Sequence, residues 1–146
     1  AFNDKYLEEI FSPQAMENSI IHEVNYLSSS IFINQGNGKF QVTALPRMTQ
    51  RSSMYTILIT DVNADGVEDL VMGGNLRGAK PEVGQYDASY GEVLIGKGDG
   101  NFEYMPNREH GLKLDGDIRD LHSLEIKGQR MLQVVRNNAA AEFWKY

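Results

Sequence analysis

The residues with the clearest chemistry lie in one nine-residue segment, 61–69, which reads D-V-N-A-D-G-V-E-D. Side chains that end in oxygen occupy its first, third, fifth and ninth positions, and glycine occupies the sixth. Ca²⁺ takes six to eight oxygen ligands, and a sharp turn allows a short loop to collect them. Four of the chain's 20 acidic residues lie here and would repel one another without a cation. The pattern therefore predicts a calcium site; the alternative is an acidic surface turn.

The flanking residues indicate which kind of calcium loop this is. An EF-hand has helices on both sides and a bidentate glutamate at position 12. Position 12 here is Met72, and residues 55–60 form a strand-like run that ends directly at Asp61. The sequence therefore favours a loop between two strands, closed by Asp69 at position 9.

Length, charge and composition narrow the class of protein. The chain has 146 residues, enough for one domain with a core. Its net charge of −6 argues against nucleic acid as a partner, because phosphate binding needs clustered lysine and arginine. No apolar run approaches the ~18 residues that cross a membrane. The absence of cysteine excludes disulfides and thiolate metal sites.

An internal repeat organises the chain. Residues 31–40 match residues 93–102 at an offset of 62, with an isoleucine, two glycines and a phenylalanine in common. Each copy reads as a hairpin, and Asn37-Gly38 and Asp99-Gly100 are expected to supply the positive φ of its turn. The same offset aligns the segment that holds the metal loop with the C-terminal part of the chain.

The second copy of the loop lacks the ligand pattern. At an offset of 62, the four oxygen-bearing positions Asp61, Asn63, Asp65 and Asp69 become Ser123, Glu125, Lys127 and Met131. Lys127-Gly128 then reads as a plain hairpin turn. We therefore expect a structural repeat in which one copy binds metal.

Short runs separated by turn residues predict an all-β fold with a short helical N-terminal segment. Strands are expected at residues 30–34, 40–44, 55–60, 69–73, 92–96, 102–105, 118–126, 130–135 and 141–146. Ser12 and Pro13 predict the start of a helical turn, and residues 6–11 predict another. Residues 20–27 are compatible with helix or strand, and we favour strand. Residues 77–90 show no pattern and read as a long inserted loop.

The loop and its surroundings resemble a known repeat. Residues 59–71, together with the two glycine-rich hairpins, resemble the FG-GAP (or VCBS) repeat of calcium-binding β-propellers such as integrin α heads. The resemblance covers residues 29–146, with residues 1–28 as a lead-in. Residues 83–91 are similar to a form of this repeat in the C-terminal regions of large Bacteroidetes surface proteins.

The resemblance implies a ligand set and a fold. The ligands of Ca²⁺ would be the side chains of Asp61, Asn63, Asp65 and Asp69 and the carbonyl of Val67. The fold would be a partial β-propeller of two to two-and-a-half blades of antiparallel strands. Because propellers close with about four to eight blades, we expect a fragment of a longer protein, or a chain that completes its sheets with another copy. The resemblance also implies an extracellular, cell-surface or periplasmic location.

Three functions follow as expectations. The first is a non-enzymatic, calcium-stabilised propeller segment that serves as a scaffold or binds protein or glycan through the loop from Arg77 to Gly91. The second is a domain of a polysaccharide-acting enzyme that uses two carboxylates, drawn from Asp87, Glu92, Asp115 and Asp117. The third is a homo-oligomer that forms by pairing of open sheet edges.

The remaining candidate residues favour structural roles. His22, His110 and His122 lie far apart in the sequence, and no catalytic partner can be assigned to them. The acidic run from Asp115 to Asp120 reads as a solvated turn ahead of a strand rather than a second metal site. The aromatic residues 143–146 are interpreted as a strand of the core rather than a sugar-stacking surface.

Overall fold

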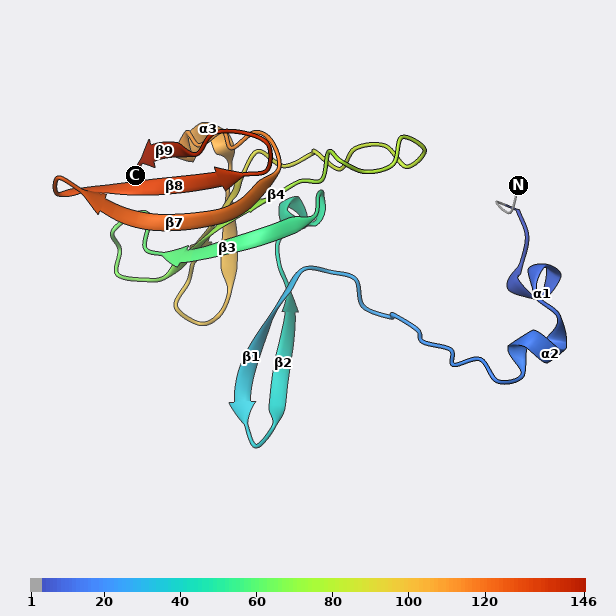
Figure 1. The fold of residues 1–146 in the computed structure, drawn as a ribbon. Helices are drawn as coiled ribbons and strands as arrows, with labels where there is room; N and C mark the ends of the chain where they lie inside the picture. Colours follow the sequence, from blue (N-terminus) through green and yellow to red (C-terminus); the bar gives the residue numbers. More distant parts are fainter. Residues whose placement is uncertain (1–3) are drawn as a thin grey trace.

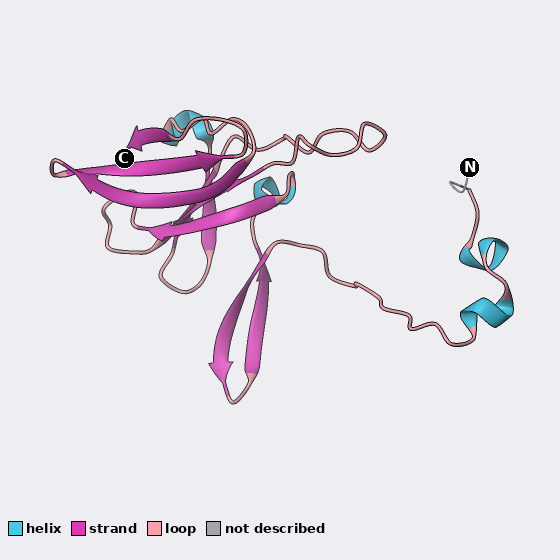
Figure 2. Ribbon diagram, in the orientation of Figure 1, coloured by secondary structure: helices cyan, strands magenta, loops and turns pink. Residues whose placement is uncertain are grey.

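The computed structural model describes residues 4–146 as three antiparallel sheets preceded by a short helical segment (Figures 1 and 2). The strands are β1 (Ser30–Gly36), β2 (Lys39–Ala44), β3 (Met54–Thr60), β4 (Asp69–Gly74), β5 (Glu92–Gly96), β6 (Phe102–Met105), β7 (Ile118–Ile126), β8 (Gln129–Arg136) and β9 (Glu142–Lys145). The helical pieces are α1 (Leu7–Ile10), α2 (Pro13–Met16), the 3₁₀ turn η1 (Arg47–Gln50) and α3 (Asn107–His110).

The sheets follow the order of the chain. β1 and β2 form a hairpin, β3-β4-β5-β6 form a four-stranded sheet, and β7-β8-β9 form a three-stranded sheet. The predicted all-β class is confirmed, although the described sheets do not close into a ring. No helix among residues 4–146 is long and apolar enough to cross a membrane.

The predicted elements agree with the structure except in the N-terminal segment. All nine expected strands after residue 29 are present, and α2 begins as expected, with Ser12 Oγ accepting the N–H of Ala15 at 3.3 Å. The strand favoured at residues 20–27 is wrong, because that segment has no regular structure. Its apolar side chains, such as Ile20 and Leu27, are exposed, so they contribute to no described core.

The two hairpins pair in the same register. Asn34 pairs with Phe40 in the first hairpin, and Gly96 pairs with Phe102 at the same offset of 62. Asn37-Gly38 and Lys127-Gly128 both have two positive φ values, which matches the twist of a tight hairpin. The Asp99-Gly100 turn differs from the expectation: Gly98 and Gly100 carry the positive φ values, and Asp99 does not.

The repeat also extends to the strands around the metal loop, with one correction. Leu70 lies opposite Ile59, and its equivalent Leu132 lies opposite Ser123. The offset is therefore 132 − 70 = 62 after the loop but 123 − 59 = 64 before it, so the uniform alignment is wrong by two residues there. The second copy has two residues fewer between the equivalent pairs, Thr60–Asp69 and Leu124–Met131. Both copies share a bulge, at Tyr55 and at Arg119.

The central strands of the four-stranded sheet, β4 and β5, are buried on both faces, whereas β3 at its edge exposes Tyr55, Ile57 and Ile59. One face packs against the three-stranded sheet, and the core there comprises Val71, Val93, Leu112, Leu114, Ile118, Leu121, Leu132 and Val134. The other face packs beneath the segment that carries the β1–β2 hairpin, and the core there comprises Leu45, Leu70, Met72 and Leu94. β3 and β7 run beside each other where the two sheets meet (Figure 1).

The predicted insertion is the chain between β4 and β5, and it projects from the sheets as a long loop (Figure 1). Its base is fixed by Asn75, whose buried side-chain amide donates to the carbonyls of Ser89 and Gly116 and accepts the N–H of Ser89. A bridge between Leu76 and Tyr86 extends this base outward. The insertion is therefore anchored at its root, and its remaining residues reach into solvent.

Candidate metal centre

The candidate metal loop, residues 61–68, joins β3 to β4 at one end of the four-stranded sheet. Two of its residues have left-handed backbone conformations, Ala64 with φ 61° and Gly66 with φ 84°. Glycine adopts this conformation at no steric cost, which explains its place at the sixth position. The loop can therefore turn sharply enough to direct its side chains inward.

Three of the predicted ligands come together in this loop. The Asp61 carboxylate accepts the N–H groups of Gly66 at 2.9 Å and Asp65 at 3.2 Å. Asn63 Oδ1 accepts the same N–H of Asp65 at 3.0 Å, while Asn63 Nδ2 donates to Asp65 Oδ2 at 2.8 Å. Asp61 and Asn63 thus share the N–H of Asp65, and Asn63 also bonds to the carboxylate of Asp65. The side-chain oxygens of the three residues therefore lie close together.

Asp61 is held in its ionised form. The N–H of Gly66 is the largest cause that lowers the pKa of Asp61, and the N–H groups of Asp65 and Ala64 and the charge of Arg130 act in the same direction. Burial opposes them in part. A carboxylate that accepts several backbone N–H groups is stabilised as an anion, which is the form that a hard cation binds.

Asp69 has a different environment from the other three. It is fully buried, Oδ2 accepts the N–H of Val62 at 2.9 Å, and Oδ1 accepts the N–H of Gly96 at 2.8 Å. Its carboxylate therefore ties the metal loop to the neighbouring strand β5. The fit is close at Gly96, where an added Cβ would lie 2.1 Å from the carbonyl oxygen of Glu68.

The remaining loop residues take up supporting positions. The N–H of Val67 donates to Asp65 Oδ1 at 2.8 Å, so the fifth predicted ligand is adjacent to the third. The side chain of Val67 packs near Gly96, with Cγ1 3.0 Å from the position of an added Cβ. Glu68, which is not in the predicted ligand set, is exposed.

The chemistry of the donors fits Ca²⁺, but their geometry is set by hydrogen bonds. Among residues 4–146, no group of three or more His, Cys, Asp or Glu side chains is arranged to hold a metal ion. Asn63 and Asp65 bond to each other, so a cation would have to replace that bond. In favour of a cation, the fully buried carboxylate of Asp69 accepts two backbone N–H groups but makes no ion pair with a described residue, and a buried carboxylate without a cationic partner is costly.

The carboxylates considered for catalysis do not form a free pair. Asp87 and Asp115 both pair with Arg77, at 3.6 and 2.6 Å, and Asp117 accepts the backbone N–H of Arg77 at 3.0 Å. Glu92 is buried elsewhere, and burial raises its pKa. The acidic residues of the inserted loop and of the turn before β7 therefore serve to anchor Arg77.

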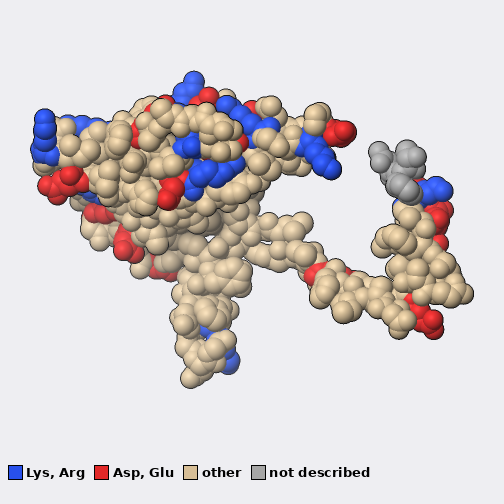
Figure 3. Space-filling view, in the orientation of Figure 1, with Lys and Arg blue, Asp and Glu red and all other residues tan. Residues whose placement is uncertain are grey.

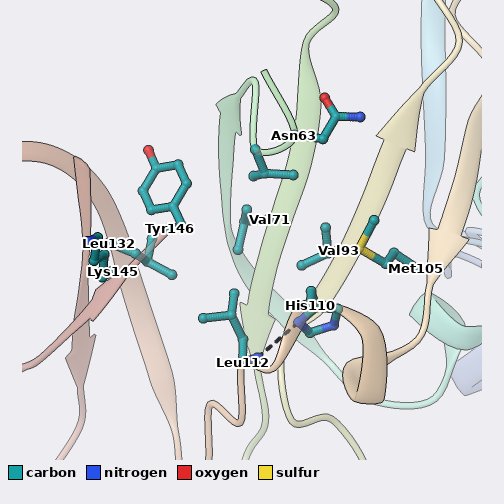
Figure 4. A pocket seen from close by; sticks show the side chains of 10 residues that line it. Asn63, Val71, Val93, Met105, His110, Leu112, Leu132, Lys145 and Tyr146 are labelled. Carbon is teal, nitrogen blue, oxygen red and sulfur yellow. Dashed lines mark hydrogen bonds between the residues drawn. The ribbon is translucent and has the colours of Figure 1, made fainter. Parts of the chain in front are cut away.

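The structure places the three histidines in different surroundings. His22 lies in the exposed N-terminal segment, and His122 is exposed beside Asp120, 2.8 Å away. His110, by contrast, ends α3, and its Nδ1 accepts the N–H of Leu112 at 3.1 Å. It lines a cavity of about 180 Å³ that also touches the metal loop (Figure 4). The sequence signal was Pro106 before and Gly111 after the four residues, which marks a short helix.

Comparison of the chain with models of protein families, with curated proteins and with solved structures finds no match.

Proposed function

We propose that this chain is a calcium-stabilised β-propeller segment that serves as a non-catalytic scaffold or binding module in a secreted or cell-surface protein. The observation that carries the proposal is the convergence of Asp61, Asn63 and Asp65 within a strand-to-strand loop. Their oxygens are the hard ligands that Ca²⁺ prefers, and the turn at Gly66 lets one short loop present them.

The arrangement of the sheets supports a propeller. Propeller blades are four-stranded antiparallel sheets placed radially, so each blade packs against a neighbour on both faces. β3-β4-β5-β6 has this strand order, and its central strands are covered on both faces. β3 and β7, the first strands of consecutive repeats, lie side by side, as innermost strands do around a propeller axis.

The expected role of calcium is to brace the loop rather than to catalyse. Calcium sites in extracellular modules have Kd values of roughly 10⁻⁴–10⁻³ M. At about 1 mM Ca²⁺ such a site adds ~0.4–1.4 kcal/mol to the free energy of unfolding by mass action. For a chain of this length that corresponds to a rise in Tm of about 1–6 °C.

Two surfaces are proposed for partners. The first is the loop from Arg77 to Gly91, whose base is rigid and whose Tyr86 and Tyr90 are exposed; aromatic rings of this kind suit protein or glycan ligands. The second is the β1–β2 hairpin, which carries few charges (Figure 3) and exposes Phe32 and Phe40. Together with the open edge of β9, the hairpin is where self-association would occur.

The alternative of a polysaccharide-acting enzyme has less support. Glycosidases need one carboxyl group to act as an acid and another to act as a base or nucleophile. Asp87 and Asp115 instead both pair with the guanidinium of Arg77, so neither is free to act with the other as an acid and base pair. We therefore propose a binding role ahead of a catalytic one.

A calcium titration followed by thermal unfolding tests the proposal. We expect the Tm of the chain to rise in about 1 mM Ca²⁺ by about 1–6 °C relative to EDTA. Asp65→Ala should abolish this rise. Glu125→Ala is the matched control, because register places Glu125 where Asp61 stands in the first copy, and it should keep the full response. No rise in the parent chain, or an equal rise in Asp65→Ala, would refute the metal site.

A further inference from the structure

We propose that residues 24–27 of one copy of this chain add to the open edge of β9 in a second copy and form the fourth strand of its three-stranded sheet. The inference rests on the part of the proposed function that places self-association at open sheet edges, and it names the segment that occupies one of them. It does not depend on calcium.

The three-stranded sheet lacks one strand that its neighbour has. Leu132 of β8 lies opposite Trp144 of β9, as its equivalent Leu70 of β4 lies opposite Leu94 of β5. β9 is therefore the counterpart of β5. On its other side β5 pairs with β6, whereas β9 ends its sheet among the described strands. The missing strand is the counterpart of β6.

The backbone of β9 is ready to accept this strand. Across the β8–β9 ladder, the N–H of Tyr146 donates to the carbonyl of Arg130 at 3.3 Å. Because the hydrogen bonds of an antiparallel pair alternate along a strand, the N–H and C=O groups of Phe143 and Lys145 point to the open side. Such a row of free backbone groups is a template for pairing with another chain.

Residues 24–27 have the side-chain pattern of β6. They read V-N-Y-L, and β6 reads F-E-Y-M. In β6 the polar second residue is exposed and the other three are partly buried. In the single chain residues 24–27 have no regular structure, and Val24 and Leu27 are 73% and 86% exposed. The segment therefore has the residues of a fourth strand but no strand partner among residues 4–146.

The receiving edge must belong to a second copy. The N–H of Ser29 donates to Gln50 Oε1 at 2.7 Å, and its carbonyl accepts the N–H of Leu45 at 2.9 Å, which fixes Ser29 on the hairpin side of the four-stranded sheet. The three-stranded sheet packs on the opposite side, about 20 Å away for two sheet-to-sheet spacings. Leu27 is two residues from Ser29 and reaches at most ~7 Å beyond it. The arm before β1 also runs away from β9 (Figure 1).

The register of β5 with β6 predicts the contacts. Leu94 lies opposite Tyr104, and Val93 lies opposite Met105. By equivalence, Tyr26 of one copy would lie opposite Trp144 of the other, and Leu27 opposite Phe143. Cross-strand pairs that contain aromatic rings stabilise a sheet, and the half-exposed ring of Phe143 would gain an apolar neighbour.

Charge favours the same partner. Residues 4–28 carry five acidic side chains and one lysine, namely Asp4, Glu8, Glu9, Glu17 and Glu23 against Lys5. The receiving edge presents Lys145, while its acidic residue, Glu142, is already paired with Arg136. The acidic arm is therefore attracted to this edge.

Sedimentation of the full chain in EDTA, at about 1–300 μM, tests the proposal without any contribution from calcium. Small interfaces bind in about the micromolar range, so we expect the mass to rise above that of the monomer. Asn25→Pro removes an N–H that would face the edge at Lys145, and it should weaken association at least about tenfold, the effect of one lost hydrogen bond. Ile20→Pro, in the same irregular segment but outside residues 24–27, is the control and should associate like the parent.

A mixing experiment shows which surfaces meet and guards against loss of folding. Lys145→Pro blocks the receiving edge, and because its N–H faces the open side, the β8–β9 ladder stays intact. We expect Lys145→Pro and Asn25→Pro to be monomeric when separate. Mixed, they should form a 1:1 complex, because one keeps the donor segment and the other keeps the edge.

Hydrogen exchange in the parent chain locates the contact. The amide of Lys145 should exchange about tenfold more slowly at a concentration where about nine tenths of the chains are associated. The proposal is overturned if the parent stays monomeric, which would assign the edge to another protein, or if Asn25→Pro associates like the parent. A mixture that stays monomeric, or exchange at Lys145 that ignores concentration, would overturn it as well.

Discussion

Asp69 provides the sharpest test of how the metal loop is built. Its carboxylate holds the partly buried N–H of Val62 and the buried N–H of Gly96. In Asp69→Ala both lose their acceptor, and a hydrogen bond to a charged group contributes about 1.5–3 kcal/mol. With a smaller share for Val62, which water can partly reach, we expect the free energy of unfolding to fall by about 3–5 kcal/mol. That is a large fraction of the ~5–15 kcal/mol typical of a domain.

Asp69→Asn separates the two hydrogen bonds. Asparagine has nearly the same shape but one acceptor oxygen, which we expect to remain on the buried N–H of Gly96 while water reaches Val62. The expected loss is therefore about 1–2 kcal/mol, well below that of alanine. Urea unfolding in EDTA measures the loss without any contribution from calcium. Hydrogen exchange should accelerate at Val62 in both variants and at Gly96 in alanine alone.

The reasoning would be wrong if both variants unfolded like the parent chain in EDTA and lost stability only when Ca²⁺ is present. Asp69 would then act as a metal ligand and not as the tie between the loop and β5. Equal losses in Asp69→Asn and Asp69→Ala would also contradict the hydrogen-bond account.

Three further changes test neighbouring parts of the fold. Gly96→Ala should destabilise the chain and weaken Ca²⁺ binding in a calorimetric titration, because the carbonyl of Glu68 leaves no room for a Cβ. Gly78→Ala is the control: its added Cβ meets nothing within 4 Å, and its free energy of unfolding should stay within about 0.5 kcal/mol of that of the parent. Asn75→Gly keeps the positive φ of 79° but loses the buried amide; we expect a loss of about 2–4 kcal/mol and rapid proteolysis of the insertion. Glu92→Gln should flatten the pH dependence of stability. Because burial raises the pKa of Glu92 in the folded chain, the parent loses stability as pH rises above about 4.5 through that raised value. Urea unfolding from pH 4 to 8 should therefore show the stability of the variant rising relative to that of the parent.

The sequence predicted the sheets well because their strands repeat and alternate. In β3, residues that face the core and residues that face solvent follow one another without a break, and tight turns such as Lys127-Gly128 mark the strand ends. The prediction failed at residues 20–27, because strand formation also needs a partner to pair with. A single-chain pattern carries no information about that partner.

The candidate site was predictable in composition but not in contacts. The spacing of Asp61, Asn63 and Asp65 indicates a loop that gathers oxygens, and the structure brings them together. The tie from Asp69 to Gly96 joins positions 27 apart, and the cavity beside His110 joins two sheets. Neither leaves a local signal, because both arise from the way the repeats stack. The sequence also did not reveal that the alignment of the two copies shifts by two residues before the loop, because the register is set by strand pairing.

The two copies of the β-hairpin show what the metal loop replaces. In β7–β8 the ladder continues to Ile126 and Gln129 and closes in a two-residue turn, whereas in β3–β4 it stops at Thr60 and Asp69 and leaves eight residues. The longer connection costs only about 1.2 kcal/mol in closure entropy, but its N–H groups lose their ladder partners. Loop side chains accept four of them instead, those of Val62, Asp65, Gly66 and Val67. Calcium would thus brace a loop that its own carboxylates already order, which is why its expected contribution is near 1 kcal/mol, far below the ~10–16 kcal/mol of a metal that organises a fold.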